Sequence, residues 1–242
     1  PCGVEMPYRR LPNTDQARIR ALKAVVVRGD VSGIYDMAVS LKTWGEVRNF
    51  LPKFEAAHAY YEECYGRQAK AGRKHQANVK IARLYISHFI QVLNLAVIRS
   101  EIRRSHKEFY GLEVRGNSVP DLTSEASLAE WGQKIIDGEN KRISQGGIPI
   151  YNPAIAKVRV YYDIFMESYE LQKSLQASTA RSLEAVKLMR AEADRLILDI
   201  WNQVEQKFAD VPLPSMRLER CREYGLVYYY RTGEKDRNKE EQ

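Results

Sequence analysis

The chain has 242 residues, of which 44% are hydrophobic and 29% are charged, and its formal net charge is +7 at pH 7. This composition is too apolar for an intrinsically disordered protein and is ordinary for a folded soluble one. It predicts a chain that buries one large core or two small ones.

The 14 glycines and 9 prolines occur in a few clusters, and long stretches between the clusters contain neither residue. Because Gly and Pro are the main local breakers, this distribution favours long helices over many short strands. We predict an all-α protein, a long-helix antiparallel bundle with a short extended C-terminal segment. The expected domains are an N-terminal extension over 1–12, a single helical bundle domain over 13–232 and a disordered charged tail over 233–242.

The first helix is predicted to begin after Asn13, which is a good N-cap residue, with Gln16 placed to complete a capping box. Gly29 is a natural C-terminal stop for this helix. A second, much longer helical stretch covers 40–103. Its pattern weakens between Gly66 and Gly72, where the chain either turns back or continues as a solvated helix.

The second half of that stretch is apolar over most of its circumference. Its polar residues fall on one stripe at 100° per residue and predict the water-facing side of an otherwise buried helix: Lys80, Arg83, Ser87, Gln91, Asn94 and Glu101. The alternative for this stripe is a polar network inside the core. His88 lies outside the stripe, so we expect it to be buried with a hydrogen-bond partner.

Two further helices follow. Thr123 or Ser124 caps a helix that ends at Gly146 and Gly147, and Asn152-Pro153 predicts the start of the last long helix, which runs to 209 without Gly or Pro. If the stretch 40–103 breaks, the bundle is four-helix-like. If it does not, the bundle is elongated and is expected to complete its core by self-association. A short helix over 216–223 and a β-like segment over 226–230 complete the chain.

The three cysteines, Cys2, Cys64 and Cys221, are widely spaced and form no C-x-x-C pattern, which fits a reducing cytoplasm better than a disulfide framework. The N-terminus has no signal-peptide pattern. The longest apolar run, 84–98, is shorter than the roughly 20 residues that a membrane span needs. We therefore predict a cytoplasmic protein with no transmembrane segment.

The strongest catalytic signal is Glu55-Ala-Ala-His58. Glu-x-x-His on a helix places both side chains on one face, and di-iron bundles use two such pairs with two further glutamates. Only one pair is present, because His75, His88 and His106 have no Glu three residues before them. Glu55 and His58 are thus weak metal candidates, and no phosphate-binding, zinc-protease or nucleophile-elbow motif accompanies them. No cofactor is predicted, and a non-enzymatic protein is favoured.

Charge is the more informative feature. Residues 64–100 contain no Asp or Glu and hold a candidate basic binding patch made of Arg67, Lys70, Arg73, Lys74, Lys80 and Arg83. Such a patch can neutralise the phosphates of a nucleic acid, or contact an acidic partner or an anionic membrane surface. The structural alternatives are a solvated helix tip and internal pairing with the acid-rich stretch Glu184–Glu205.

Four stretches resemble a family of uncharacterised bacterial helical proteins with a YRRLPNTD-like N-terminus. They are Tyr8–Asp15, Ala82–Asn94, Glu108–Leu112 and Glu223–Gly225. The resemblance extends over nearly the whole chain and implies one folded unit. It implies no activity, cofactor or catalytic residue.

These observations lead to three functional hypotheses. The first is a non-enzymatic helical scaffold or protein-interaction protein that associates with a protein partner or with itself. The second is a nucleic-acid-binding bundle that uses the acid-free segment 64–100. The third is a metal-binding bundle enzyme built around Glu55 and His58.

Overall fold

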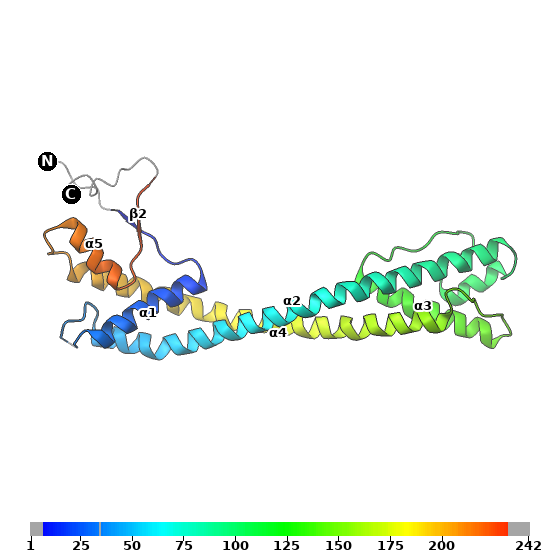
Figure 1. The fold of residues 1–242 in the computed structure, drawn as a ribbon, viewed down its shortest axis with the longest axis horizontal. Coiled ribbons are helices and arrows are strands. Elements are labelled where there is room, and N and C mark those ends of the chain that lie inside the picture. The colour runs from blue at the N-terminus through cyan, green and yellow to red at the C-terminus, as the bar shows by residue number, and fades with distance from the viewer. Residues whose placement is uncertain (1–6, 34, 232–242) are drawn as a thin grey trace. The chain divides into compact units, whose positions relative to one another are not determined.

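The computed structural model describes residues 7–33 and 35–231, and 74% of these residues are helical. The prediction of an all-α bundle with long packed helices is confirmed (Figure 1). In chain order the elements are β1 (Tyr8–Arg9), α1 (Asp15–Val31), α2 (Leu41–Ile98), the 3-10 helix η1 (Arg104–Tyr110), α3 (Glu125–Ser144), α4 (Ile155–Lys207), α5 (Pro214–Glu223) and β2 (Tyr228–Tyr229).

The chain divides into two compact units. Unit 1 consists of 1–63 and 180–242, and unit 2 consists of 64–179. Both long helices contribute to both units, because α2 passes from unit 1 to unit 2 and α4 returns. The predicted single domain over 13–232 stays a prediction, and the predicted tail over 233–242 lies outside the described residues.

Unit 1 is built from α1, α5, the first part of α2 and the last part of α4. Its core is fully buried and includes Leu22, Val47, Phe54, Leu196 and Trp201. The described part of the predicted N-terminal extension belongs to this unit, since β1 pairs with β2 in antiparallel register. The predicted extended C-terminal segment corresponds to β2.

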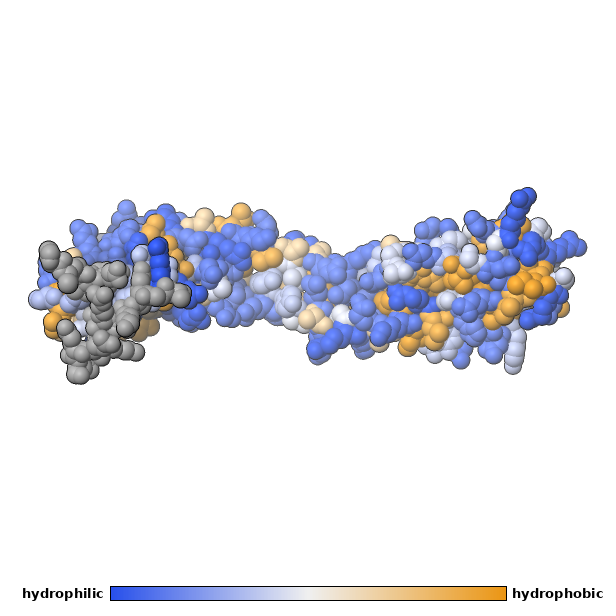
Figure 2. All heavy atoms as spheres, turned by 90° about the horizontal axis from the view of Figure 1, so that it is seen from above, coloured by the Kyte–Doolittle hydropathy of each residue, from blue (hydrophilic) through white to orange (hydrophobic). Residues whose placement is uncertain are grey.

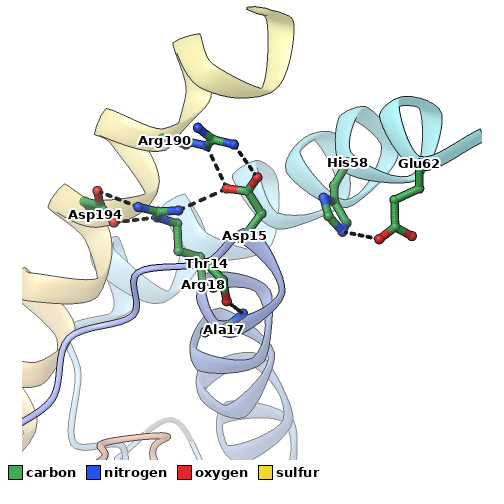
Figure 3. Close-up of polar contacts among 8 residues, drawn as sticks. All are labelled: Thr14, Asp15, Ala17, Arg18, His58, Glu62, Arg190 and Asp194. Atoms are coloured by element: carbon green, nitrogen blue, oxygen red, sulfur yellow. Dashed lines mark hydrogen bonds and ion pairs between the residues drawn. The ribbon is translucent and has the colours of Figure 1, made fainter. Parts of the chain in front are cut away.

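Asp15, in the first turn of α1, fixes α1 to α4 within unit 1. Its carboxylate accepts hydrogen bonds from Arg190 Nη2 at 2.7 Å and from Arg18 Nη1 at 3.0 Å (Figure 3). Arg18 also donates to Asp194 Oδ1 at 2.8 Å. Burial raises the pKa of Asp15, but the hydrogen bonds and charges of Arg190 and Arg18 outweigh burial and hold the pKa below its usual value.

Unit 2 is built from α3, η1, the second part of α2 and the first part of α4. Its core contains Ile86, Phe89, Leu128, Ile135 and Phe165, all fully buried. Close approach of α3 depends on glycine, because a Cβ at position 132 would lie 2.3 Å from the ring of Tyr162. Helices α2 and α4 also contact each other in this unit, where Tyr85 of α2 stacks on Tyr161 of α4 with 4.5 Å between ring centroids.

The predicted helix boundaries need four corrections, and the largest is at the end of the second helical stretch, which is predicted to reach 103 but ends at Ile98. Thr14, one residue after Asn13, is the N-cap of α1, and its hydroxyl accepts from the Ala17 amide at 3.1 Å. α1 continues past Gly29 to Val31, because this glycine serves packing: a Cβ there would lie 2.1 Å from Trp44 Nε1. The last long helix begins at Ile155, two residues after the predicted Pro153.

The stretch Gly66–Gly72 does not break the second helix. α2 is continuous from Leu41 to Ile98 and also contains Pro52. Each glycine costs about 1 kcal/mol relative to alanine in a helix. The residues between them, including Gln68, Ala69 and Lys70, are good helix formers that offset this cost.

Candidate interaction face of the long helix α2

The second half of α2 exposes a row of four large apolar and two polar side chains on the face opposite its core face. This row, the α2 seam, consists of Ile81, Leu84, His88, Gln91, Leu95 and Ile98, and all six side chains are exposed. The exposed fractions of Leu84, Leu95 and Ile98 are 64%, 50% and 54%. The opposite face carries the buried Ala82, Ile86, Phe89, Leu93 and Val97.

This arrangement corrects two expectations. His88 is exposed rather than buried. Within the predicted water-facing stripe, Asn94 is buried, and its Nδ2 donates to the Asn117 backbone oxygen at 3.1 Å. The segment after α2 covers this part of the stripe, so the apolar face 180° from the core is the one left exposed. Figure 2 shows apolar side chains gathered among hydrophilic ones over unit 2.

The candidate basic patch lies along the helix just before the seam. Lys70, Arg73, Lys74 and Lys80 are exposed, and we call them the basic face. Arg67 is exposed as well. In the described part of the chain no carboxylate forms an ion pair with any side chain of the basic face. These four cations are therefore available to an anionic partner.

Arg83 differs from the rest of the predicted patch. Its Nε donates to the Leu122 backbone oxygen at 2.9 Å, and its Nη2 donates to that of Thr123 at 3.0 Å. Arg83 thus fixes the segment that leads into α3. Two aromatic residues close to the patch in sequence are not available to it, because His75 is buried and Tyr85 is stacked on Tyr161.

Internal pairing with the acid-rich stretch is not what the described contacts show. Glu192 pairs with Arg195, Asp194 with Arg18, and Glu205 with Arg9. All of these partners belong to unit 1, whereas the basic face belongs to unit 2.

Glu55 and His58 each contact a different charged residue. Glu55 Oε2 lies 3.7 Å from Lys23 Nζ. His58 Nε2 lies 3.2 Å from Glu62 Oε1 (Figure 3). Over residues 7–33 and 35–231, no three His, Cys, Asp or Glu side chains are grouped to hold a metal ion. The geometry therefore adds no further ligands to this candidate pair.

A buried His75 is the polar feature that the sequence did not reveal. Only 2% of it is exposed. Its Nδ1 lies 2.6 Å from Ser168 Oγ on α4, and its Nε2 contacts Glu125 Oε1 on α3. Ser168 Oγ also lies 3.1 Å from the Phe165 backbone oxygen, which can only accept. The roles of the two ring nitrogens depend on the tautomer of His75: a neutral imidazole that donates its Nε2 proton to the Glu125 carboxylate has an acceptor at Nδ1, facing the Ser168 hydroxyl.

Helix α2 also contains an 18-residue window with a mean hydropathy high enough for a membrane span, and 44% of that window is buried inside the protein. A core helix of a soluble protein meets the same criterion, so this finding is weak support for membrane insertion. The predicted absence of a transmembrane segment stays a prediction.

Protein-family models, curated proteins and solved structures were compared with the chain, and none of them matches it.

Proposed function

We propose that the protein is a non-enzymatic helical scaffold that binds protein partners through the exposed face of α2. The observation that carries the proposal is the α2 seam. Single exposed apolar side chains are common on protein surfaces, but four large apolar side chains in one row, at both ends of a polar centre, favour an interaction site. The seam residues recur at alternating spacings of three and four, the pattern by which one helix packs along another.

The rest of α2 supports this assignment. The same helix already uses its other face for the core of unit 2, including Phe89 and Leu93. Its rigid backbone holds the seam in a fixed row, which lowers the entropy cost of binding.

The test compares capture by the wild type with capture by a seam variant. Leu84→Glu combined with Leu95→Glu should abolish retention of specific protein partners from native lysate, with unchanged helicity by circular dichroism. The matched control is Leu171→Glu combined with Leu188→Glu, which changes two exposed leucines on α4. Retention of the same proteins by the seam variant would contradict the proposal.

Nucleic-acid binding is a second candidate function, supported by the unpaired cations of the basic face. Binding to duplex DNA or RNA should weaken as a power of salt concentration, because each neutralised phosphate releases counterions. Reversal of Lys70, Arg73 and Lys74 to Glu should reduce affinity by about tenfold or more at low salt. The control reverses Lys42, Lys53 and Lys187, three exposed lysines of unit 1. No mobility shift by the wild type at low salt would exclude this candidate.

A further inference from the structure

We infer that the occupant of the α2 seam is a second copy of this chain, paired antiparallel along α2 about a two-fold axis between Phe89 and Ile90. The inference rests on the proposed function, which it deepens by naming the partner. It draws on the order of residues within the seam, which the proposed function does not use.

The seam has the same residue order from both ends. Read from either end of the helix, the order is isoleucine, leucine, a polar residue, a polar residue, leucine and isoleucine. An antiparallel two-fold pairing sets Ile81 against Ile98 of the second copy and Leu84 against Leu95 of the second copy. A C2 interface requires this self-complementarity, since the same patch must contact itself in reverse.

The polar centre of the seam also fits this pairing. His88 lies opposite Gln91 of the second copy, once on each side of the axis. An imidazole N–H can donate to the amide oxygen, so both polar side chains gain a partner when the contact excludes water. A polar pair at one level of an apolar seam fixes register in helix pairs.

Charge favours the antiparallel over the parallel orientation. Lys70 and Lys74 continue the seam spacing toward the N-terminus, and both are exposed. A parallel pair would place each of these lysines beside its own copy, and like charges at such positions repel. In the antiparallel pair both lysines extend beyond Ile98, where α2 of the second copy has ended. Lys80 lies opposite Arg99 of the second copy, whose charge is balanced by Glu101 at 2.9 Å.

The exposed apolar row of α4 does not have this symmetry. Val160, Ile164 and Leu171 are exposed at helical spacing, with Glu167 between them. The same antiparallel operation would set Ile164 against the carboxylate of Glu167 in a second copy. Burial of that unpaired charge is costly, so self-pairing is assigned to α2.

The first test is the mass of the protein in solution, measured by sedimentation equilibrium. The wild type should be a dimer at micromolar concentration, and Leu84→Glu with Leu95→Glu should raise the dissociation constant about 100-fold or more. Leu171→Glu with Leu188→Glu should remain dimeric. The inference is overturned if the wild type is still a monomer at about 100 times the micromolar concentration. It is also overturned if the seam variant dimerises as the wild type does.

The second test reads orientation by oxidative cross-linking and does not depend on the charged variants. In a Cys2→Ser background, Leu84→Cys and Leu95→Cys proteins should cross-link when mixed, since the other cysteines, Cys64 and Cys221, are buried. Each protein alone should not cross-link, because two copies of position 84 lie about 16 Å apart along the axis at 1.5 Å per residue. Cross-linking of Leu84→Cys alone indicates a parallel pair and overturns the inference.

Two outcomes separate this inference from the proposed function. If the wild type is monomeric but the seam variant loses a different protein partner, self-pairing fails and the scaffold proposal stands. If the wild type is monomeric and the seam variant loses only binding to anionic phospholipid vesicles, both fail and the seam faces a lipid surface.

Discussion

Arg142 Nη2 donates to Glu139 Oε1 at 2.7 Å across one turn of α3, and both side chains are almost completely buried in unit 2. Tyr110 Oη donates to the same carboxylate oxygen at 2.7 Å, and the Ile150 amide donates to the other at 3.0 Å. Arg142 Nη2 also donates to the Ile148 backbone oxygen at 2.7 Å. One buried ion pair thus connects α3 to η1 and to the segment before α4.

Glu139→Gln should destabilise unit 2 by about 3–5 kcal/mol, because it leaves the buried Arg142 guanidinium without its counter-charge. Urea denaturation followed by circular dichroism measures the loss, and hydrogen exchange of α3 amides locates it. Glu130→Gln is the control, since it removes the exposed pair with Lys134 and should cost less than about 1 kcal/mol. Equal costs for the two variants would show that the buried network is unimportant.

Asp15 should make the stability of unit 1 depend on pH in the acidic range. Its folded pKa lies below the ordinary value of 3.8, so the carboxylate contributes its full stabilisation above pH 3.8 and loses it as the pH falls through the lower folded pKa. Asp15→Asn should lower stability by about 1–3 kcal/mol at pH 7, because it removes charge-assisted hydrogen bonds to Arg190 and Arg18. Denaturation curves at a series of pH values should converge for the two proteins toward pH 2. A constant difference down to that pH would contradict this assignment.

Two glycine substitutions should have opposite effects. Gly66→Ala adds a methyl group with no atom within 4 Å in the middle of α2, and should raise stability by about 0.5–1 kcal/mol. Gly132→Ala forces a Cβ into the ring of Tyr162 and should lower stability by about 1–3 kcal/mol. Thermal unfolding of both variants measures the contrast. A destabilising Gly66→Ala would indicate that α2 is not continuous at this point.

Substitutions of His75 should separate packing from polar contacts. His75 stacks on Phe165 at 5.9 Å and on Tyr169 at 6.3 Å between ring centroids. His75→Ala should cost about 3–5 kcal/mol, as expected for a large side chain removed from a core. His75→Phe keeps the ring and loses the contacts to Ser168 and Glu125, so it should cost about 1–3 kcal/mol. Equal unfolding free energies for these variants would assign the whole contribution of His75 to its polar contacts.

Local patterns were sufficient to predict most of the helices. The cap at Ser124 and the Gly146-Gly147 stop correctly bound α3, and the breaker-free run after Asn152-Pro153 corresponds to α4. The errors at Asn13 and Gly29 have different causes. Thr14 competes with Asn13 as a cap by one residue, and Gly29 is required by a side chain from another helix, which local patterns cannot register.

The candidate face was harder to predict because it depends on which side of α2 the rest of unit 2 covers. Both faces of residues 81–98 are apolar, and the sequence reading assigned the polar stripe to water. The chain after α2 instead buries Asn94 and binds Arg83, so the face at His88 is left exposed. His75 contacts Glu125 and Ser168, which are far from it in the sequence. Contacts of this kind cannot be predicted from the spacing of neighbouring residues.

The division of the chain has a consequence for the order in which its parts can be completed. Unit 2 is one uninterrupted segment, whereas unit 1 is assembled from two segments that flank it. On the ribosome, every residue of unit 2 has been synthesised before the second half of unit 1 begins. Core residues of α1 such as Leu22 must wait for Trp201 and its neighbours on α4 before their apolar surface is covered. The apolar face of α1 is therefore exposed on the nascent chain until the last part of α4 has been synthesised.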